Sequence, residues 1–170
     1  MKNIFLILAM LFSVALNAQV TKVSIQASGL TCSMCSNAIN KALQKIDAVE
    51  KVTANIKNSS FDVTFKQNAA VDFDVLKNKV EDAGFFVAKF TATMQFDNVA
   101  LKNDEHIVVA GNTFHFLNVK TQTLNGGYTI RLLDKGFVPA KEFKKNSSFT
   151  KMACYKTGDE NGARIFHVTI

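Results

Sequence analysis

Two cysteines lie three positions apart in the run Gly29–Cys35, which reads GLTCSMC. In this run an alternating strand pattern gives way to an amphipathic helical pattern. The start of a helix offers unpaired backbone N–H groups and a partial positive charge, which stabilise a thiolate over a thiol. The spacing therefore favours a site at which Cys32 and Cys35 hold a soft metal ion.

The number of ligands narrows the choice of metal. Two residues three apart share a helix face, so both thiolates can converge on one ion. Structural zinc usually takes four protein ligands, and the sequence has neither a second CxxC pair nor a His pair at zinc spacing. Soft thiolates at low coordination number suit Cu(I), and an ion held so openly can pass to a thiolate of a partner protein. The sequence therefore predicts binding and relay, or sequestration, of Cu(I).

The elements around the cysteines follow the order strand, helix, strand, strand, helix, strand. Val23, Ile25 and Ala27 alternate with polar residues, as in a strand with one buried face. This order matches the split βαβ unit of ferredoxin-like folds, with one antiparallel sheet and both helices on one face. The expected strands cover residues 21–27, 52–56, 61–65 and 85–90, and the expected helices follow Cys35 and the N-cap Asp72.

The run Gly29–Cys35 and the helix after it resemble the GMTCxxC signature of heavy-metal-associated domains. Ala83-Gly84-Phe85 is similar to the family's small-Gly-aromatic step before the last strand, and the similarity covers residues 21–90. The resemblance implies that Cys32 and Cys35 bind Cu(I), or in some members Hg(II), Zn(II) or Cd(II). It also implies that Phe85 packs beside the metal loop.

Two other residues of this run have no expected role as metal ligands: Leu30 is interpreted as a support for the loop, and Met34 as a bystander. Leu30 occupies the position where the family usually has a buried Met that supports the loop. Leucine is apolar and of similar volume, so this replacement should cost little stability. Met34, between the two thiols, is expected to be a solvent-exposed bystander. The resemblance to copper chaperones and exported mercury carriers implies another metal-handling protein, such as a transporter or chaperone, as partner.

The first 18 residues have the pattern of an export signal. Lys2 precedes an apolar stretch from Ile4 to Leu16, which is short of the ~20 residues needed to cross a bilayer, and cleavage after Ala18 is expected. The mature protein is thus expected in the periplasm or secreted, from a bacterium, with no permanent membrane span. In an oxidising compartment Cys32 and Cys35 could also close a disulfide.

The overall charge points to no nucleic-acid partner. The net charge is +6, but the lysines are spread along the whole chain and accompany no nucleic-acid-binding motif. The sequence also lacks a Ser-His-Asp order, a phosphate-cradling glycine loop and suggestively paired carboxylates. The protein is therefore expected not to be an enzyme.

Residues 91–170 show short strands separated by turn signals. A hairpin is expected over residues 107–119 with a turn at Gly111-Asn112, Gly126-Gly127 is expected to be a turn, and a last strand covers 163–170. No amphipathic helix is expected, and Lys141–Lys151 is interpreted as a solvated loop. The prediction is a small antiparallel all-β barrel or sandwich over 91–170, after a heavy-metal-associated domain over 19–90 and a signal peptide over 1–18.

Two other functions use the same cysteine pair. One is a thiol-disulfide redox protein, and the other is an interaction module in which Cys32 and Cys35 form a structural disulfide. A thioredoxin-like enzyme would carry a cis-proline facing its CxxC, whereas the sole proline, Pro139, lies far downstream. Metal binding is therefore favoured over redox catalysis.

Cys154 and the three histidines complete the set of candidate ligands. Cys154, in the segment Met-Ala-Cys-Tyr, is interpreted as a buried small apolar residue; a third metal-binding sulfur and a dimerisation thiol are the alternatives. His106, His115 and His167 lie on separate expected strands. Since only folding could bring them together, the sequence does not favour a histidine metal site.

Overall fold

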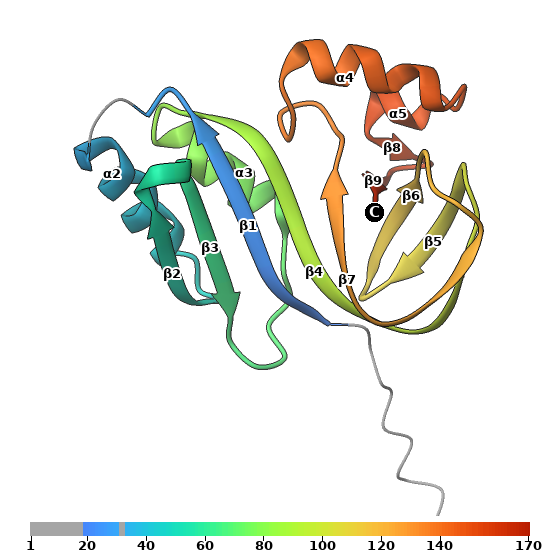
Figure 1. Cartoon of the computed structure of the whole chain (residues 1–170), viewed down its shortest axis with the longest axis horizontal. Helices are drawn as coiled ribbons and strands as arrows, with labels where there is room; N and C mark the ends of the chain where they lie inside the picture. Colours follow the sequence, from blue (N-terminus) through green and yellow to red (C-terminus); the bar gives the residue numbers. More distant parts are fainter. Residues whose placement is uncertain (1–18, 31–32) are drawn as a thin grey trace, which may run out of the picture.

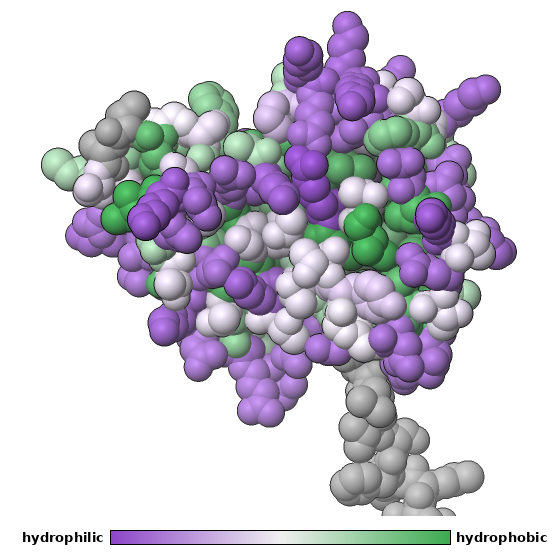
Figure 2. Space-filling model, viewed as in Figure 1, coloured by the Kyte–Doolittle hydropathy of each residue, from purple (hydrophilic) through white to green (hydrophobic). Residues whose placement is uncertain are grey.

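The computed structural model describes residues 19–30 and 33–170. The predicted signal peptide and Cys32 lie outside the described residues. The strands of the described chain form one mixed sheet, in the order β2-β3-β1-β4-β7-β9-β6-β5, with β8 paired to β9 (Figure 1). Over the same residues, no helix is long and apolar enough to cross a membrane. Figure 2 shows hydrophilic side chains distributed over both halves of the face seen there.

The elements follow one another in a regular succession of short helices and strands. The N-terminal half contains β1 (Val20–Ser28), α2 (Ser33–Gln44), β2 (Val49–Asn55), the short 3-10 helix η2 (Ile56–Asn58), β3 (Ser60–Phe65) and α3 (Phe73–Asp82). The C-terminal half follows with β4 (Phe86–Leu101), β5 (Glu105–Val109), β6 (Asn112–Phe116), β7 (Gln122–Leu132), α4 (Ala140–Asn146), η3 (Ser147–Phe149), α5 (Cys154–Thr157), β8 (Asp159–Glu160) and β9 (Ala163–Thr169).

The N-terminal half has the predicted βαββαβ order. Strand β1 lies between β3 and β4 and is antiparallel to both, and β2 forms the edge next to β3. Helices α2 and α3 bury Ile39, Leu43, Leu76 and Val80 in the same core and cover one face of these strands (Figure 1). The predicted cap of α3 is confirmed, because the Asp72 carboxylate accepts a hydrogen bond from the backbone N–H of Val75 at 3.0 Å.

Strand β4 joins the two halves of the chain. It pairs with β1 along one edge and with β7 along the other, and it runs through the predicted domain boundary near Thr91. Phe73 of α3 contacts Phe90 of β4 and also Phe114 and Phe166 of the C-terminal half, at ring-centroid distances of 5.8, 6.1 and 5.2 Å. The two segments therefore share one strand and one core, and their division into domains at residue 90 stays a prediction.

The C-terminal half differs from the prediction of an antiparallel all-β domain. Strands β6 and β9 are parallel, and α4 and α5 add two short helices. Helix α4 occupies most of the predicted loop Lys141–Lys151. It begins after Pro139, whose fixed φ suits a helix start, but seven residues are too few to show a helical period.

The prediction of a turn at Gly126-Gly127 is also wrong, because both glycines lie within β7. Gly126 has φ +92° and pairs with Phe96, next to a register shift between Phe96 and Val99 of β4. Glycine inside a strand often marks such an irregularity. The predicted hairpin is confirmed by the pairing of β5 with β6, but its turn lies one residue earlier than predicted, at Ala110-Gly111, because Asn112 already pairs with Val109.

Candidate metal site

Cys35 lies in the first turn of α2, as the sequence predicts. It is the third residue of the helix and is half-buried. Backbone N–H groups in this turn have no partner within the helix, so the turn favours a negatively charged sulfur. Met34 beside it is 82% exposed, as expected of a bystander.

The loop that precedes α2 leaves β1 through a glycine. Ser28, the last residue of β1, pairs with Phe86, and Gly29 then adopts φ +86°. This left-handed conformation is accessible to glycine at little cost and strained for other residues. Leu30 is half-buried and packs against the core, which agrees with the role of an apolar prop.

Phe85 lies beside this loop. It follows Gly84, which has φ +88° and ends the turn after α3. A Cβ atom on Gly29 would lie 3.9 Å from Cδ1 of Phe85, so the aromatic ring and the glycine are neighbours. The ring is half-buried against the core, whereas the next residue, Phe86, is 72% exposed. This position agrees with the one that the family resemblance implies for Phe85.

Folding also brings together the residues that the sequence treats as scattered. Ring centroids of His106 and His115 are 4.4 Å apart, and those of His115 and His167 are 5.1 Å apart. Cys154 is buried, as predicted, but its sulfur lies among these three rings. The expectation of separate histidines is therefore wrong.

One signal in the sequence could have revealed part of this cluster. The signal is the hairpin, whose two-residue turn at Ala110-Gly111 sets the register in which His106 pairs with His115. The predicted turn, one residue later at Gly111-Asn112, would have placed Leu117 opposite His106 instead. The parallel pairing of β6 with β9, which places His167 opposite His115, has no such local signal.

Burial sets the ionisation of two residues in this cluster. Burial raises the pKa of the Cys154 thiol, and the negative charge of Glu160 raises it further. Burial lowers the pKa of His115, as do the neighbouring His167 and His106, against the opposing effect of Asp104. The protein environment alone thus favours a thiol and a neutral imidazole.

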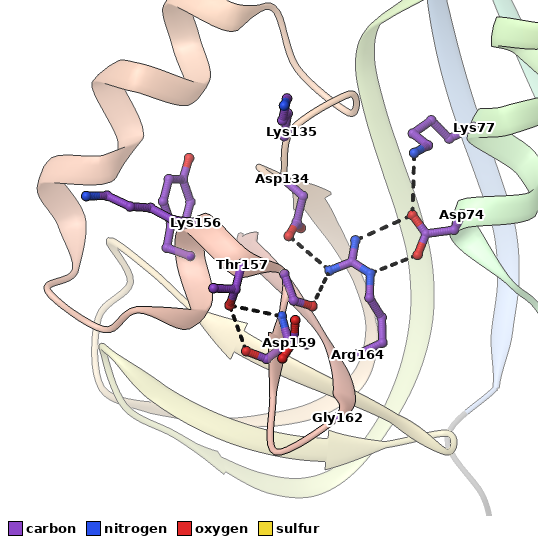
Figure 3. Close-up of a pocket in the computed structure, with 11 residues that line it drawn as sticks. Asp74, Lys77, Asp134, Lys135, Lys156, Thr157, Asp159, Gly162 and Arg164 are labelled. Carbon is purple, nitrogen blue, oxygen red and sulfur yellow. Dashed lines mark hydrogen bonds and ion pairs between the residues drawn. The ribbon is translucent and has the colours of Figure 1, made fainter.

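A charged network lies next to the histidine cluster and reaches the N-terminal half. Arg164 of β9 lies between Asp74 of α3 and Asp134, with hydrogen bonds to both carboxylates (Figure 3). Asp134 is 3% exposed and also accepts a hydrogen bond from the backbone N–H of His167 at 2.8 Å. Burial lowers the pKa of Arg164, but the hydrogen bond to Asp74 and the charges of both aspartates raise it overall, so the residue stays cationic.

Comparisons with known proteins point to one family. A sequence model of the heavy-metal-associated domain matches residues 24–86. The mercuric transport protein periplasmic component of Serratia marcescens is 34% identical over 86 residues, which is 50% of this chain and 93% of that protein. The copper-transporting ATPase RAN1 of Arabidopsis thaliana is 34% identical over 64 residues, which is 38% of this chain but only 6% of that ATPase.

A solved structure is also similar. Oxidized MerP from Ralstonia metallidurans CH34 has 30% sequence identity to the matched part, a TM-score of 0.37, and coverage of 42% of this chain and 94% of that chain. The chain spans less than a tenth of the copper-transporting ATPases that it matches. Nearly the whole length of the Serratia mercuric transport protein component is covered, at 34% identity. The chain belongs to the heavy-metal-associated domain family.

Proposed function

We propose that the protein binds Cu(I) through Cys32 and Cys35 and relays it to another metal-handling protein, such as a transporter or chaperone. The position of Cys35 carries this proposal. Its sulfur lies in the first turn of α2, beside a glycine-led loop, in a chain that belongs to a family of metal-binding domains. The proposed activity is binding and transfer, not catalysis.

The exposure of the surrounding residues supports transfer over permanent storage. Met34 is largely exposed and Cys35 is half-buried, so a partner can approach the first turn of α2. Two thiolates leave the coordination of Cu(I) incomplete, and a partner thiolate can therefore bind the ion before an original Cu–S bond breaks. Copper stays in the +1 state throughout this exchange.

The two cysteines have different roles in this proposal. Cys32 precedes the helix and exchanges first with the partner thiolate, while Cys35 is held by the first turn of α2. In a transfer assay with a thiol-containing acceptor, Cys32→Ser should abolish the copper-bridged intermediate. If Cys35→Ser abolishes the intermediate and Cys32→Ser leaves it intact, this order of exchange is wrong.

We also propose that the protein works after export, in the periplasm or as a secreted protein. The apolar stretch within residues 1–18 supports export, and the Serratia relative carries the name of a periplasmic component. Hg(II), Zn(II) and Cd(II) are the other ions to compare with Cu(I), because the same thiolate pair can bind them.

Competition with a Cu(I) chelator under anaerobic, reducing conditions tests the proposal. We expect the protein to retain Cu(I) against the chelator, and the double variant Cys32→Ser/Cys35→Ser to lose it. Met34→Leu is the matched control, because it removes the exposed sulfur between the two thiols and should leave binding unchanged. Equal retention by the double variant would refute copper binding by the pair, and insulin reduction that depends on the pair would favour the redox function.

A further inference from the structure

Three histidines and a cysteine of the C-terminal half converge on one point. His106, His115 and His167 come from the adjacent strands β5, β6 and β9, and strand pairing places them side by side. Cys154, the first residue of α5, faces all three rings. Its Sγ lies 3.6 Å from Nε2 of His106, 3.5 Å from Nδ1 of His115 and 3.5 Å from Nε2 of His167.

Each imidazole meets a carboxylate with its other ring nitrogen. The distances are 3.3 Å from Nδ1 of His106 to Glu160, 2.8 Å from Nε2 of His115 to Asp104, and 2.9 Å from Nδ1 of His167 to Asp134. A carboxylate accepts the N–H of such a ring, so the proton resides on that side and the opposite nitrogen presents its lone pair. A carboxylate behind each imidazole is the usual arrangement around metal-ligating histidines.

Hydrogen bonds to the Cys154 thiol cannot satisfy all three of the imidazole nitrogens that face it. A thiol has one proton and can donate to only one of the three facing nitrogens. Charging all three rings instead would place three cations at ring separations of about 4 to 5 Å, with His115 and His167 fully buried. A metal cation bound by a thiolate and three neutral imidazoles satisfies every lone pair at once.

The distances fit a tetrahedral ion. With a Zn–S bond of about 2.3 Å and Zn–N bonds of about 2.0 to 2.1 Å, a tetrahedral angle places the sulfur about 3.5 to 3.6 Å from each nitrogen. The three distances from Cys154 have these values. The ligand atoms of three of these residues, His106, His115 and Cys154, all lie within 4.8 Å of one another. His167 is not part of that group and joins the cluster through its 3.5 Å contact with the Cys154 sulfur.

We propose that Cys154, His106, His115 and His167 form a second metal site, which takes Zn(II). One thiolate and three imidazoles are a donor set for a borderline ion with tetrahedral preference, whereas Ca(II) and Mg(II) require oxygen ligands. Four protein ligands close the coordination sphere, so the ion has a structural role. The ion connects α5 to β5, β6 and β9. Zinc binding here does not depend on copper binding by Cys32 and Cys35.

The test uses the full chain with Cys32→Ser and Cys35→Ser, in which Cys154 is the remaining thiol. Titration with Zn(II) against a chromophoric chelator should show one bound equivalent, and Co(II) should give a thiolate charge-transfer band with tetrahedral d–d bands. Adding Cys154→Ser should abolish the charge-transfer band and weaken zinc binding at least about tenfold. Met152→Leu, which removes a nearby exposed sulfur, should change neither.

A second variant keeps the test decisive if Cys154→Ser folds poorly. His106 is the ligand with partial exposure, 23% for its side chain, so His106→Gln disturbs the core least. It should also weaken zinc binding, with an unfolding midpoint in chelator equal to that of its parent. The proposal fails if the parent binds no zinc, if Cys154→Ser and His106→Gln bind as tightly as the parent, or if the site takes copper and excludes zinc.

Asp134 is a positioning residue for this site, because it holds the backbone and the ring of His167. Asp134→Asn should weaken zinc binding by about 10- to 100-fold and shift the d–d bands of bound Co(II). Asp159→Asn, an exposed acidic residue lining the same pocket as Asp134, is the control and should leave both unchanged (Figure 3). Unchanged cobalt bands in Asp134→Asn would refute the positioning role.

Discussion

Arg164 of β9 donates a hydrogen bond from Nε to the Asp74 carboxylate of α3 at 2.8 Å (Figure 3). Its Nη1 also lies 3.3 Å from Asp134, which in turn holds His167. The guanidinium lies over the Phe166 ring, 4.2 Å from the centroid. One arginine thus links the helix that covers the heavy-metal-associated half to the strand that carries a ligand of the proposed zinc site.

Removal of this arginine should destabilise the protein. Arg164→Met keeps much of the side-chain length but leaves the buried Asp134 without its cation. We expect the free energy of unfolding to fall by about 1 to 3 kcal/mol, measured by urea unfolding followed by circular dichroism. Arg131→Met removes the ion pair with Glu142, a carboxylate that is 29% exposed where Asp134 is 5% exposed, and should cost less than about 1 kcal/mol. Equal losses in the two variants would show that the burial of Asp134 is unimportant.

The aromatic core predicts that the two halves unfold together. Phe73→Ala removes a fully buried ring of α3 and should lower the free energy of unfolding by about 3 to 5 kcal/mol. The chain has no tryptophan, and its two tyrosines, Tyr128 and Tyr155, lie in the C-terminal half, so tyrosine fluorescence reports on that half. The fluorescence midpoint should shift by the same amount as the circular dichroism midpoint. A fluorescence midpoint that does not move would support two independent domains instead.

The elements predicted from the sequence are those with one buried face. Val23 and Ile25 alternate with polar residues in β1, and Leu76 and Val80 recur at helical spacing in α3, because each element packs a single side on the core. Asp72 was predictable as an N-cap because its interaction is local. Cys35 was predictable for the same reason, since its position in the first turn of α2 depends only on neighbouring residues.

Features that depend on distant pairing escaped prediction. Gly126-Gly127 has the composition of a turn, and its place in β7 follows from pairing with the irregular part of β4. His167 meets His115 only through a parallel pairing between segments far apart in the chain. A single sequence contains no local pattern for either contact, so the complete cluster of three histidines appears only in the folded protein.

Gly29 and Gly84 provide a matched pair of substitutions. Both have strongly positive φ, +86° and +88°, and a Cβ on either would meet no atom closer than an ordinary van der Waals contact. Alanine at either position should therefore cost about 1 to 2 kcal/mol of folding stability, from backbone strain. Only Gly29→Ala should also weaken Cu(I) binding in the chelator competition, because Gly29 begins the proposed binding loop. Equal effects of the two substitutions on binding would contradict a role for the loop conformation.

Asp62 should make stability depend on pH. Its carboxylate lies 2.7 Å from Nζ of Lys22. Burial raises the pKa of Asp62, but hydrogen bonds from Lys22 and Ser24 and the charge of Lys22 lower it below its ordinary value of 3.8 overall. The folded state thus favours the carboxylate, which stabilises the fold above this ordinary value and ceases to do so as the pH falls through the lowered pKa.

Asp62→Asn tests this dependence. The urea midpoint of the variant should lie below that of the unsubstituted protein near neutral pH, and the gap should close as the pH falls through the lowered pKa of Asp62, because both proteins then carry an uncharged group at this position. Added salt should narrow the gap as well, because both side chains are partly exposed. A gap that stays constant from neutral to acidic pH would show that the ion pair does not cause it.

Alanine substitutions of Phe85 and of its neighbour Phe86 distinguish a ring that supports the metal loop from a ring on the surface. Phe85→Ala removes the half-buried ring beside Gly29 and should lower the free energy of unfolding by about 1 to 3 kcal/mol. It should also speed the release of Cu(I) to a chelator, because the loop loses the ring against which it packs. Phe86→Ala removes a ring that faces solvent, so it should change stability by less than about 0.5 kcal/mol and leave copper release as it is. Faster release in Phe86→Ala than in Phe85→Ala would place the important ring on the exposed face of β4 instead of beside the loop.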